Sequence, residues 1–193
     1  MLLTQSTPGT TNPVPLREFA EHLRLAHGFE DDTAQDALLE VYLRSATTVI
    51  ERRLSCALIR RTYELRVAHW DRYGYLTLPV GPVSEIASIR FERPGMVTSL
   101  APEEWYVKPG ETRQKLTGPK NTALRDIPHG ALAVLTFEAG YGETWNDVPD
   151  DLRQAVMVMA AHNYEHRGND ATITTTIPPA VRAILTPRQP TRL

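Results

Sequence analysis

Apolar residues recur at helical spacing in the C-terminal part of the chain. Residues 150–167 contain no Gly or Pro, and their apolar positions cover more than one side of a helix. These positions are Leu152, Val156, Met157, Val158, Met159, Ala160 and Ala161. A helix that is apolar nearly all round is a buried one. We therefore predict a central helix over residues 150–167, with Asp147 as its N-cap and Gly168 as its stop.

Two further apolar stripes predict helices nearer the N-terminus. One covers residues 16–26 and is followed by Gly28, which can end a helix. The other covers residues 34–54 and is preceded by capping residues at 31–33. The inner face predicted for this longer helix is Leu38, Tyr42, Ala46, Val49 and Ile50, with Leu39, Leu43 and Leu54 beside it. Because each stripe needs a partner, we expect these helices to pack against the helix at 150–167.

Between these helices the apolar period becomes that of strands. Tyr63, Leu65 and Val67 alternate with polar residues, which is typical of a half-buried strand. Further strands are predicted at 75–78, 85–91, 105–107 and 131–137, with Pro and Gly between them. The last of these is apolar on both faces, so we expect it at the centre of the sheet. The whole pattern predicts an α+β fold, in which a mostly antiparallel sheet at about 58–140 is inserted between helices that pack together.

The two ends of the chain differ in composition from the predicted domain at 16–168. Residues 1–15 are rich in Thr, Pro and Gly, which predicts an irregular arm. Residues 169–193 are rich in Pro and Thr, and they contain three arginines but no acid after Asp170. Pro178 or Pro179 can begin a short helix that ends at Leu185. A tail with spaced apolar residues and no core of its own is a candidate for docking to a partner.

Composition narrows the possible functions. The net charge of −2 gives no reason to expect general affinity for nucleic acids or membranes. Cys56 is the only cysteine, which excludes a disulfide within the chain and any metal site made of several cysteines. No apolar run approaches the roughly 18 residues of a membrane span. The first 15 residues also lack the pattern of a signal peptide.

Sequence motifs for catalysis are largely missing. His162 and His166 lie four residues apart, which places two imidazoles on one face of a helix, but no third metal ligand is identifiable. Cys56 has no known catalytic signature around it, and a free cysteine is commonly a small buried apolar residue. The glycines form neither of the nucleotide-binding patterns GxGxxG and GxxxxGK[ST], and no GxSxG nucleophile motif occurs. The residues therefore predict no enzyme, no metal and no cofactor.

Arginines gather where the second helix gives way to the first strand. They are Arg52, Arg53, Arg60, Arg61 and Arg66. Glu51 and Glu64 are the only acids between residues 51 and 66. Two interpretations remain open: a solvated surface with local ion pairs, or a contact with an acidic partner or with DNA phosphates that weakens with salt.

The order of these segments resembles the head–tail connector (adaptor) family of long-tailed double-stranded DNA phages and phage-like gene transfer particles. The resemblance covers about residues 16–168. It rests on the segments LREFAEHLRL, DALLEVYLRSATTVIERRL, LTLPVGPVSEIASIRF, EEWYV, LAVLTFEAGYGE and VPDDLRQAVMVMAAHNYEHRG in this order. The later segment IPPAVRAILTPR is similar to the C-terminal segment of the family. The proline-rich arm and the ending TPRQPTRL depart from the family pattern.

The resemblance implies a structural role without catalytic residues or cofactors. Family members form a ring, commonly of twelve copies, between the capsid portal and a stopper or tail, and DNA passes through its lumen. Their C-terminal segment engages the portal. By that correspondence, the portal-binding residues here are Ile173, Ile177, Pro178, Val181, Arg182, Ile184 and Leu185. The implied location is the neck of a virion or phage-like particle assembled in the bacterial cytoplasm.

Three other functions stay open at this point. One is a stopper or tail-completion protein of the same assembly. Another is a nucleic-acid-binding module that uses the arginines between Arg52 and Arg66. The third is a small enzyme that uses Cys56 or the histidine pair.

Overall fold

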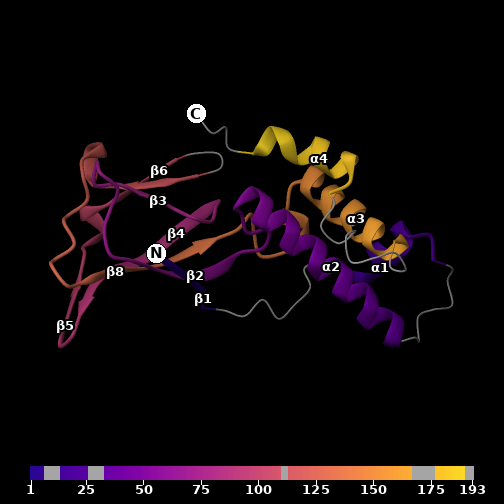
Figure 1. The fold of residues 1–193 in the computed structure, drawn as a ribbon, viewed down its shortest axis with the longest axis horizontal. Coiled ribbons are helices and arrows are strands. Elements are labelled where there is room, and N and C mark those ends of the chain that lie inside the picture. The colour runs from indigo at the N-terminus through magenta and orange to yellow at the C-terminus, as the bar shows by residue number, and fades with distance from the viewer. Residues whose placement is uncertain (7–13, 26–32, 110–112, 167–176, 190–193) are drawn as a thin grey trace. The chain divides into compact units, whose positions relative to one another are not determined.

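The computed structural model describes residues 1–6, 14–25, 33–109, 113–166 and 177–189 of the 193-residue chain (Figure 1). The chain divides into two compact units. The first, which we call the β unit, consists of Met1–Gly9 and Ser55–Tyr141. The second, the helical unit, consists of Thr10–Leu54 and Gly142–Leu193. Each unit is therefore assembled from segments that lie far apart in the sequence.

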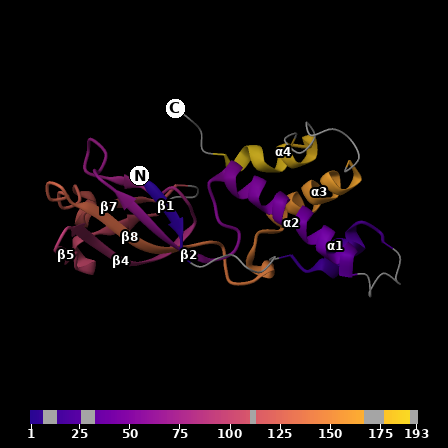
Figure 2. The same cartoon turned by 60° about the horizontal axis from the view of Figure 1, so that its bottom comes forward.

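A five-stranded antiparallel sheet forms the larger part of the β unit. Its order is β1-β2-β8-β4-β5, and neighbouring strands are antiparallel throughout. The strands are β1 (Leu2–Gln5), β2 (Arg61–Val67), β8 (Leu132–Ala139), β4 (Val83–Arg93) and β5 (Met96–Ser99). Figure 2 shows β8 with β2 and β4 along its two sides. The central position predicted for the segment at 131–137 is thus confirmed.

A three-stranded sheet completes the β unit and shares its core. It has the order β3-β7-β6, formed by β3 (Leu76–Thr77), β7 (Lys115–Thr117) and β6 (Tyr106–Lys108). Side chains from both sheets belong to one cluster of buried apolar residues. Tyr63 and Phe137 stack within this cluster with ring centroids 5.6 Å apart. The alternation predicted for β2 is confirmed, because its residues 63, 65 and 67 are buried.

The N-terminal arm was predicted to be irregular, and the structure corrects this for its first residues. Leu2–Gln5 form strand β1, in which Leu2 lies opposite Arg66 of β2. β5 and β7 were also not predicted. All three strands have only three or four residues, so they contain barely one repeat of the alternating pattern. Pairing with a longer neighbour, rather than their own sequence, determines their conformation.

The helical unit contains four α-helices in its described part. They are α1 (Leu16–His22), α2 (Thr33–Leu54), α3 (Asp150–Glu165) and α4 (Pro179–Leu185). α2 packs along α3, α1 contacts both, and α4 packs on α3. This confirms the expected packing of the first helices against the C-terminal helix and gives the α+β fold that was predicted. No described helix is both long and apolar enough to span a membrane.

The buried face of α2 differs from the predicted one by about one residue position. The residues that are buried are Leu39, Leu43, Ala46, Thr47, Ile50 and Leu54. Leu38 is 40% exposed, Val41 is 51% exposed, and both Tyr42 and Val49 are only partly covered. The helix carries two adjacent apolar stripes, and consecutive residues are separated by about 100° around the axis. Contacts with α3 select one stripe, which the sequence pattern alone could not do.

The start of α3 also differs from the prediction. Asp147 was predicted as its N-cap, but Pro149 occupies that position. The Asp147 carboxylate instead accepts hydrogen bonds from the backbone N–H and the hydroxyl of Thr144, both at 2.9 Å. These bonds stabilise the 3₁₀ turn at Trp145–Asp147 that leads into the helix. Gly168, the predicted stop, lies outside the described residues.

Candidate functional site

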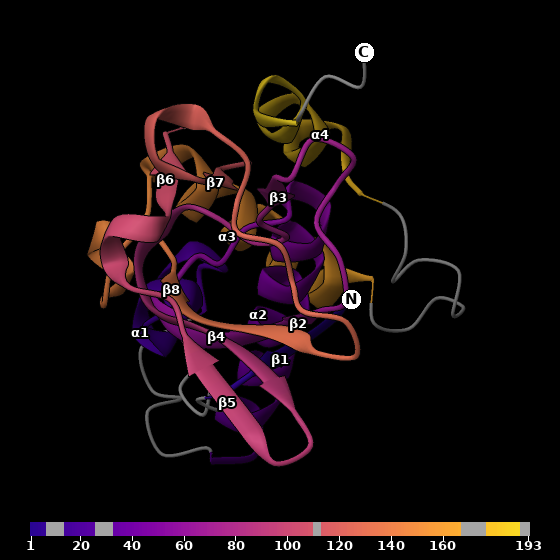
Figure 3. The same ribbon diagram turned by 90° about the vertical axis from the view of Figure 1, so that its left-hand side faces the viewer.

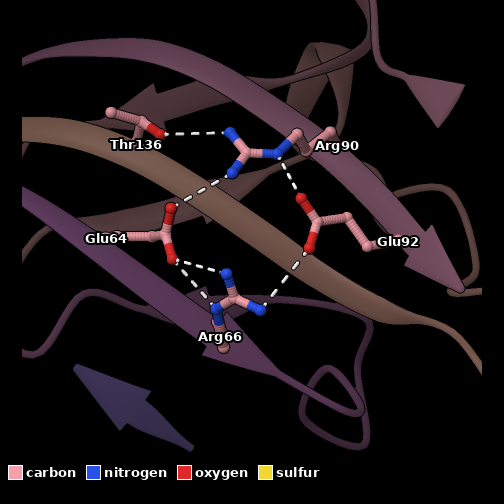
Figure 4. A network of polar contacts seen from close by, with 5 residues as sticks. All are labelled: Glu64, Arg66, Arg90, Glu92 and Thr136. Atoms are coloured by element: carbon pink, nitrogen blue, oxygen red, sulfur yellow. Dashed lines mark hydrogen bonds and ion pairs between the residues drawn. The ribbon is translucent and has the colours of Figure 1, made fainter. Parts of the chain in front are cut away.

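The solvent-facing side of the five-stranded sheet carries a closed network of four charged side chains (Figure 4). Arg66 contacts Glu64 at 2.9 Å and Glu92 at 3.5 Å. Arg90 contacts the same two carboxylates, Glu64 at 3.1 Å and Glu92 at 2.6 Å. Each arginine therefore bridges both glutamates, and each glutamate accepts from both arginines. The two positive and two negative charges balance within the network.

The network lies over Val134 of β8. In the strand register, Val134 stands between Arg66 of β2 and Arg90 of β4. Its neighbours Ala133 and Leu135 belong to the core, so Val134 points to the opposite face of the strand. Its exposure is nevertheless 0%. We attribute this burial to the side chains of the two arginines, whose apolar stems cover the valine while their guanidinium groups pair with the glutamates.

The network shifts the pKa values of Glu64 and Arg90. Hydrogen bonding from Arg66 holds the pKa of the Glu64 carboxyl below its ordinary value of 4.5, although partial burial opposes this effect. Hydrogen bonding to Glu92 raises the pKa of the Arg90 guanidinium. Both shifts favour the charged forms of Glu64 and Arg90. The network is a neutral patch and not a basic surface.

A second polar arrangement fastens the C-terminal helix in the helical unit. Arg188 follows α4, and its guanidinium donates to both carboxylate oxygens of Asp151, at 2.6 and 2.9 Å. Asp151 lies in the first turn of α3, where a negative charge is also favourable to the helix dipole. Such a two-point pair fixes orientation as well as distance. It ties the end of the C-terminal segment to the start of α3.

The predicted portal-binding residues divide into buried and accessible groups. Val181 and Leu185 are 0% and 1% exposed and belong to the core of the helical unit, and Pro178 is also buried. Arg182 is exposed, and both Ile177 and Ile184 are partly exposed. Ile173 lies outside the described residues. A partner that meets α4 in its observed position therefore meets its arginine and isoleucine side, while the other apolar residues hold the helix on α3.

The predicted arginine cluster is divided between the two units. Arg52 and Arg53 are exposed in the last turn of α2, where positive charge suits the C-terminal end of a helix. Arg60 and Arg61 lie at the start of β2 in the β unit. Arg66 is engaged in the neutral network. Of the five arginines in the DNA-binding interpretation, Arg66 is thus already paired with glutamates of the same chain.

Comparison with solved structures decides the family. A chain in the neck of an empty gene transfer agent (GTA) particle, computed with C6 symmetry, is 34% identical over all of this chain and 97% of the other, with a TM-score of 0.87. The chain belongs to the head–tail connector family. A chain in the virion of a native GTA particle is also 34% identical, with the same coverage and a TM-score of 0.85.

A third related chain comes from the neck of a native GTA particle computed with C12 symmetry. It is 31% identical, with coverage of 100% of this chain and 97% of the other, and a TM-score of 0.82. No protein-family model and no curated protein matches the chain. The resemblance stated from the sequence segments is therefore confirmed by structures that match over the full length.

The histidine pair and Cys56 are the remaining chemical candidates of this connector-family chain. The rings of His162 and His166 lie 4.2 Å apart, and His166 Nδ1 is 2.8 Å from the carbonyl oxygen of His162. Within the described ranges, no group of three possible metal ligands includes this pair. Cys56 is partly buried, and its backbone forms a bridge with Gly81.

Sequence reasoning missed both polar arrangements of the connector-family chain. Glu64 and Arg66 are two residues apart in a strand, as are Arg90 and Glu92, so each pair shares one face. That spacing was a usable signal. Closing the network, however, required knowing that β8 lies between the two strands. The Arg188–Asp151 pair spans 37 positions and left no local signal.

Proposed function

We propose that this connector-family chain is a structural subunit of the neck of a phage-like particle, without enzymatic activity. In this role several copies form a ring that joins the capsid portal to a stopper or tail, and DNA passes through the lumen. The observation that carries the proposal is the full-length match to chains of GTA necks at 31–34% identity. The C6 and C12 symmetries of those necks support a ring, with twelve copies as the expected number.

We further propose that the C-terminal tail, residues 169–193, docks to the portal protein. Arg182, Ile177 and Ile184 are the contact side chains in this proposal, because they are accessible on or beside α4. Val181 and Leu185 contribute by packing α4 on α3, in an orientation that leaves the contact side chains accessible to the portal. A single helix of seven residues offers little contact area, so one copy alone should bind weakly. Many copies on one portal gain from effective concentration.

The test is size-exclusion chromatography with light scattering on mixtures of the chain with the portal protein of the same particle. The variant combines Ile184→Asp with Arg182→Glu, which alters the accessible side of α4 and leaves Val181 and Leu185 in place. The matched control combines Leu38→Asp with Arg44→Glu, which makes the same change of charge at exposed positions of α2. The isolated chain is expected to be monomeric, because the portal acts as the template for the ring.

We expect the unmodified chain and the control to co-migrate with the portal, and the α4 variant to elute separately with an unchanged thermal unfolding midpoint. Co-migration of the α4 variant would refute docking through this segment. If the unmodified chain does not co-migrate either, a stopper or tail-completion role in the same neck replaces the adaptor role. Substitutions on α4 test docking more specifically than a deletion of α4, because the deletion would also remove two core residues.

A further inference from the structure

The five-stranded sheet of the β unit ends in two strands whose outer edges have no strand partner among the described residues. β1 is at one end and β5 at the other. Figure 3 shows β5 next to β4, which is its one strand partner among the described residues. An open edge presents backbone N–H and C=O groups to any strand that approaches, and proteins usually protect it with charged residues or proline. The sequences LLTQ of β1 and MVTS of β5 contain neither.

The backbone groups that face outward can be identified from the pairing. Leu100 N–H donates to Ile89 at 2.9 Å, and inward and outward groups alternate along an antiparallel strand. Val97 and Ser99 therefore direct their N–H and C=O groups away from β4. On the other side of the sheet, Ser6 N–H donates to Thr62 at 3.0 Å, so Leu3 points its backbone groups away from β2. The outer edge of β5 thus offers hydrogen-bonding groups two residues apart, and the outer edge of β1 offers those of Leu3.

Both edges also carry exposed apolar side chains. Leu2 is 61% exposed and Val97 is 63% exposed. Leu2 lies opposite Arg66, and Val97 lies opposite Glu92, so both side chains are on the face that carries the charged network. Met96 beside Val97 is 49% exposed. Apolar side chains at both edges of one sheet face suit a contact in which these edges meet.

We propose that β5 of one copy pairs with β1 of the next copy, which joins neighbouring copies in the neck ring. This inference rests on the ring of the proposed function. The partner is a second copy because the chain itself offers two different and compatible edges, and a head-to-tail contact between different surfaces generates a ring. Four antiparallel steps separate β1 from β5, so the two strands run in the same direction. A sheet that continues across the joint therefore makes a parallel pair, with Leu2 near Val97 of the neighbouring copy.

The joint is expected to be weak in free solution. Each edge strand has four residues, so a pair forms only a few hydrogen bonds. Strand pairs this short are stable only within a larger assembly. The edges should therefore stay apart in the isolated chain and meet when the portal brings copies together.

Cysteine cross-linking tests the joint. In a Cys56→Ser background, Leu2→Cys and Val97→Cys are combined, the chain is assembled on the portal, and the complex is oxidised and run on a non-reducing gel. We expect a ladder of covalent multimers from the double variant, and dimers alone from a mixture of the two single variants. The control combines Val97→Cys with Tyr106→Cys. Tyr106 is 51% exposed but lies on the three-stranded sheet, so this control should give no ladder.

The outcomes separate this inference from the proposed function. A portal complex that yields no ladder overturns the edge joint and leaves the adaptor role intact. Dimers from the Leu2→Cys variant alone would indicate two β1 edges in contact, which also overturns it. If no portal complex forms, the adaptor role and the joint that rests on it both fall. As a second measurement, light scattering gives the number of copies bound per portal. Val97→Lys should lower this number, whereas Val97→Thr should not.

Discussion

At the scale of single residues, Val134 is a fully buried apolar side chain on the solvent-facing side of the sheet. Its neighbours across the strands are Arg66 and Arg90, and its exposure is 0%. A valine on an open sheet face would leave apolar surface in water. The charged network flanks it on both neighbouring strands and adds no net charge. This side of the sheet therefore combines a polar outer surface with a buried apolar contact.

Replacing Glu64 by Gln should destabilise the β unit by about 1 kcal/mol at pH 7, since partly exposed ion pairs contribute little individually. The pKa of Glu64 is lower in the folded protein than its ordinary value of 4.5. Its contribution is therefore complete above about pH 4.5 and is lost as the pH falls through the folded value. The difference in unfolding free energy between the two proteins, measured with urea at pH 7 and pH 3, should shrink at the lower pH.

The control for this experiment is Glu103→Gln. Glu103 is exposed, and no ion pair with it occurs among the described residues. Its replacement should leave the unfolding free energy unchanged at both pH values. A Glu64 difference that stays the same at pH 3 would contradict the role given to this carboxylate.

Gly140 is the residue at which an added methyl group should be most damaging. Its φ is +141°, and a Cβ there would lie 2.4 Å from the backbone nitrogen of Arg60. Gly140→Ala should cost more than about 3 kcal/mol of unfolding free energy, because a strained conformation and a backbone clash act together. The matched change Gly130→Ala shares a positive φ of +74° but meets nothing within 4 Å. It should cost only about 1 kcal/mol in the same urea titration.

At the scale of elements, α4 serves two purposes on its two sides. Val181 and Leu185 fill the core against α3, whereas Arg182 faces solvent. The sequence predicted this short helix and its apolar residues. All of these apolar residues were interpreted as docking residues, however, and none as part of the core. Periodicity identifies an apolar stripe and leaves open whether the chain itself or a partner covers it. The same limit applies to α2, where packing on α3 chose Leu39 and Leu43 over Leu38.

The two sides of α4 should respond differently to truncation. Leu185→Ala should lower the unfolding free energy of the helical unit by about 2–5 kcal/mol, because it leaves a cavity in the core. Ile184→Ala removes a partly exposed side chain and should cost less than about 1 kcal/mol. Denaturation curves followed by circular dichroism give both values. Equal losses would mean that α4 is not held as the structure describes.

At the scale of the whole molecule, the β unit is an insertion with adjacent entry and exit points. Tyr141 N–H donates to the carbonyl of Leu58 at 3.3 Å, so the chain leaves the unit next to where it enters. The sequence predicted this insertion from the change of apolar period. It could not predict that residues 2–5 return to the sheet, because their pairing with β2 is separated from them by about 60 positions.

Replacing Ser55–Tyr141 by a flexible linker of about eight residues should leave the helical unit folded, since such a linker can reach about 25 Å. Circular dichroism should show a cooperatively melting, mainly helical protein. The proposed docking through α4 predicts that this shortened chain binds the portal. It should lack the cross-links that require β1 and β5. A shortened chain without a cooperative transition would show that the helical core depends on the inserted sheet.

Each unit is assembled from segments far apart in the sequence, and this has a consequence for synthesis of the protein. The β unit needs residues near the start of the chain together with Ser55–Tyr141, and α3 and α4 come only after that segment. A polypeptide whose synthesis stops before residue 142 therefore lacks half of the helical unit. Such a fragment also lacks α4, the helix on which the proposed docking to the portal depends. Incomplete translation products therefore cannot complete the helical unit and would be left out of the ring proposed above.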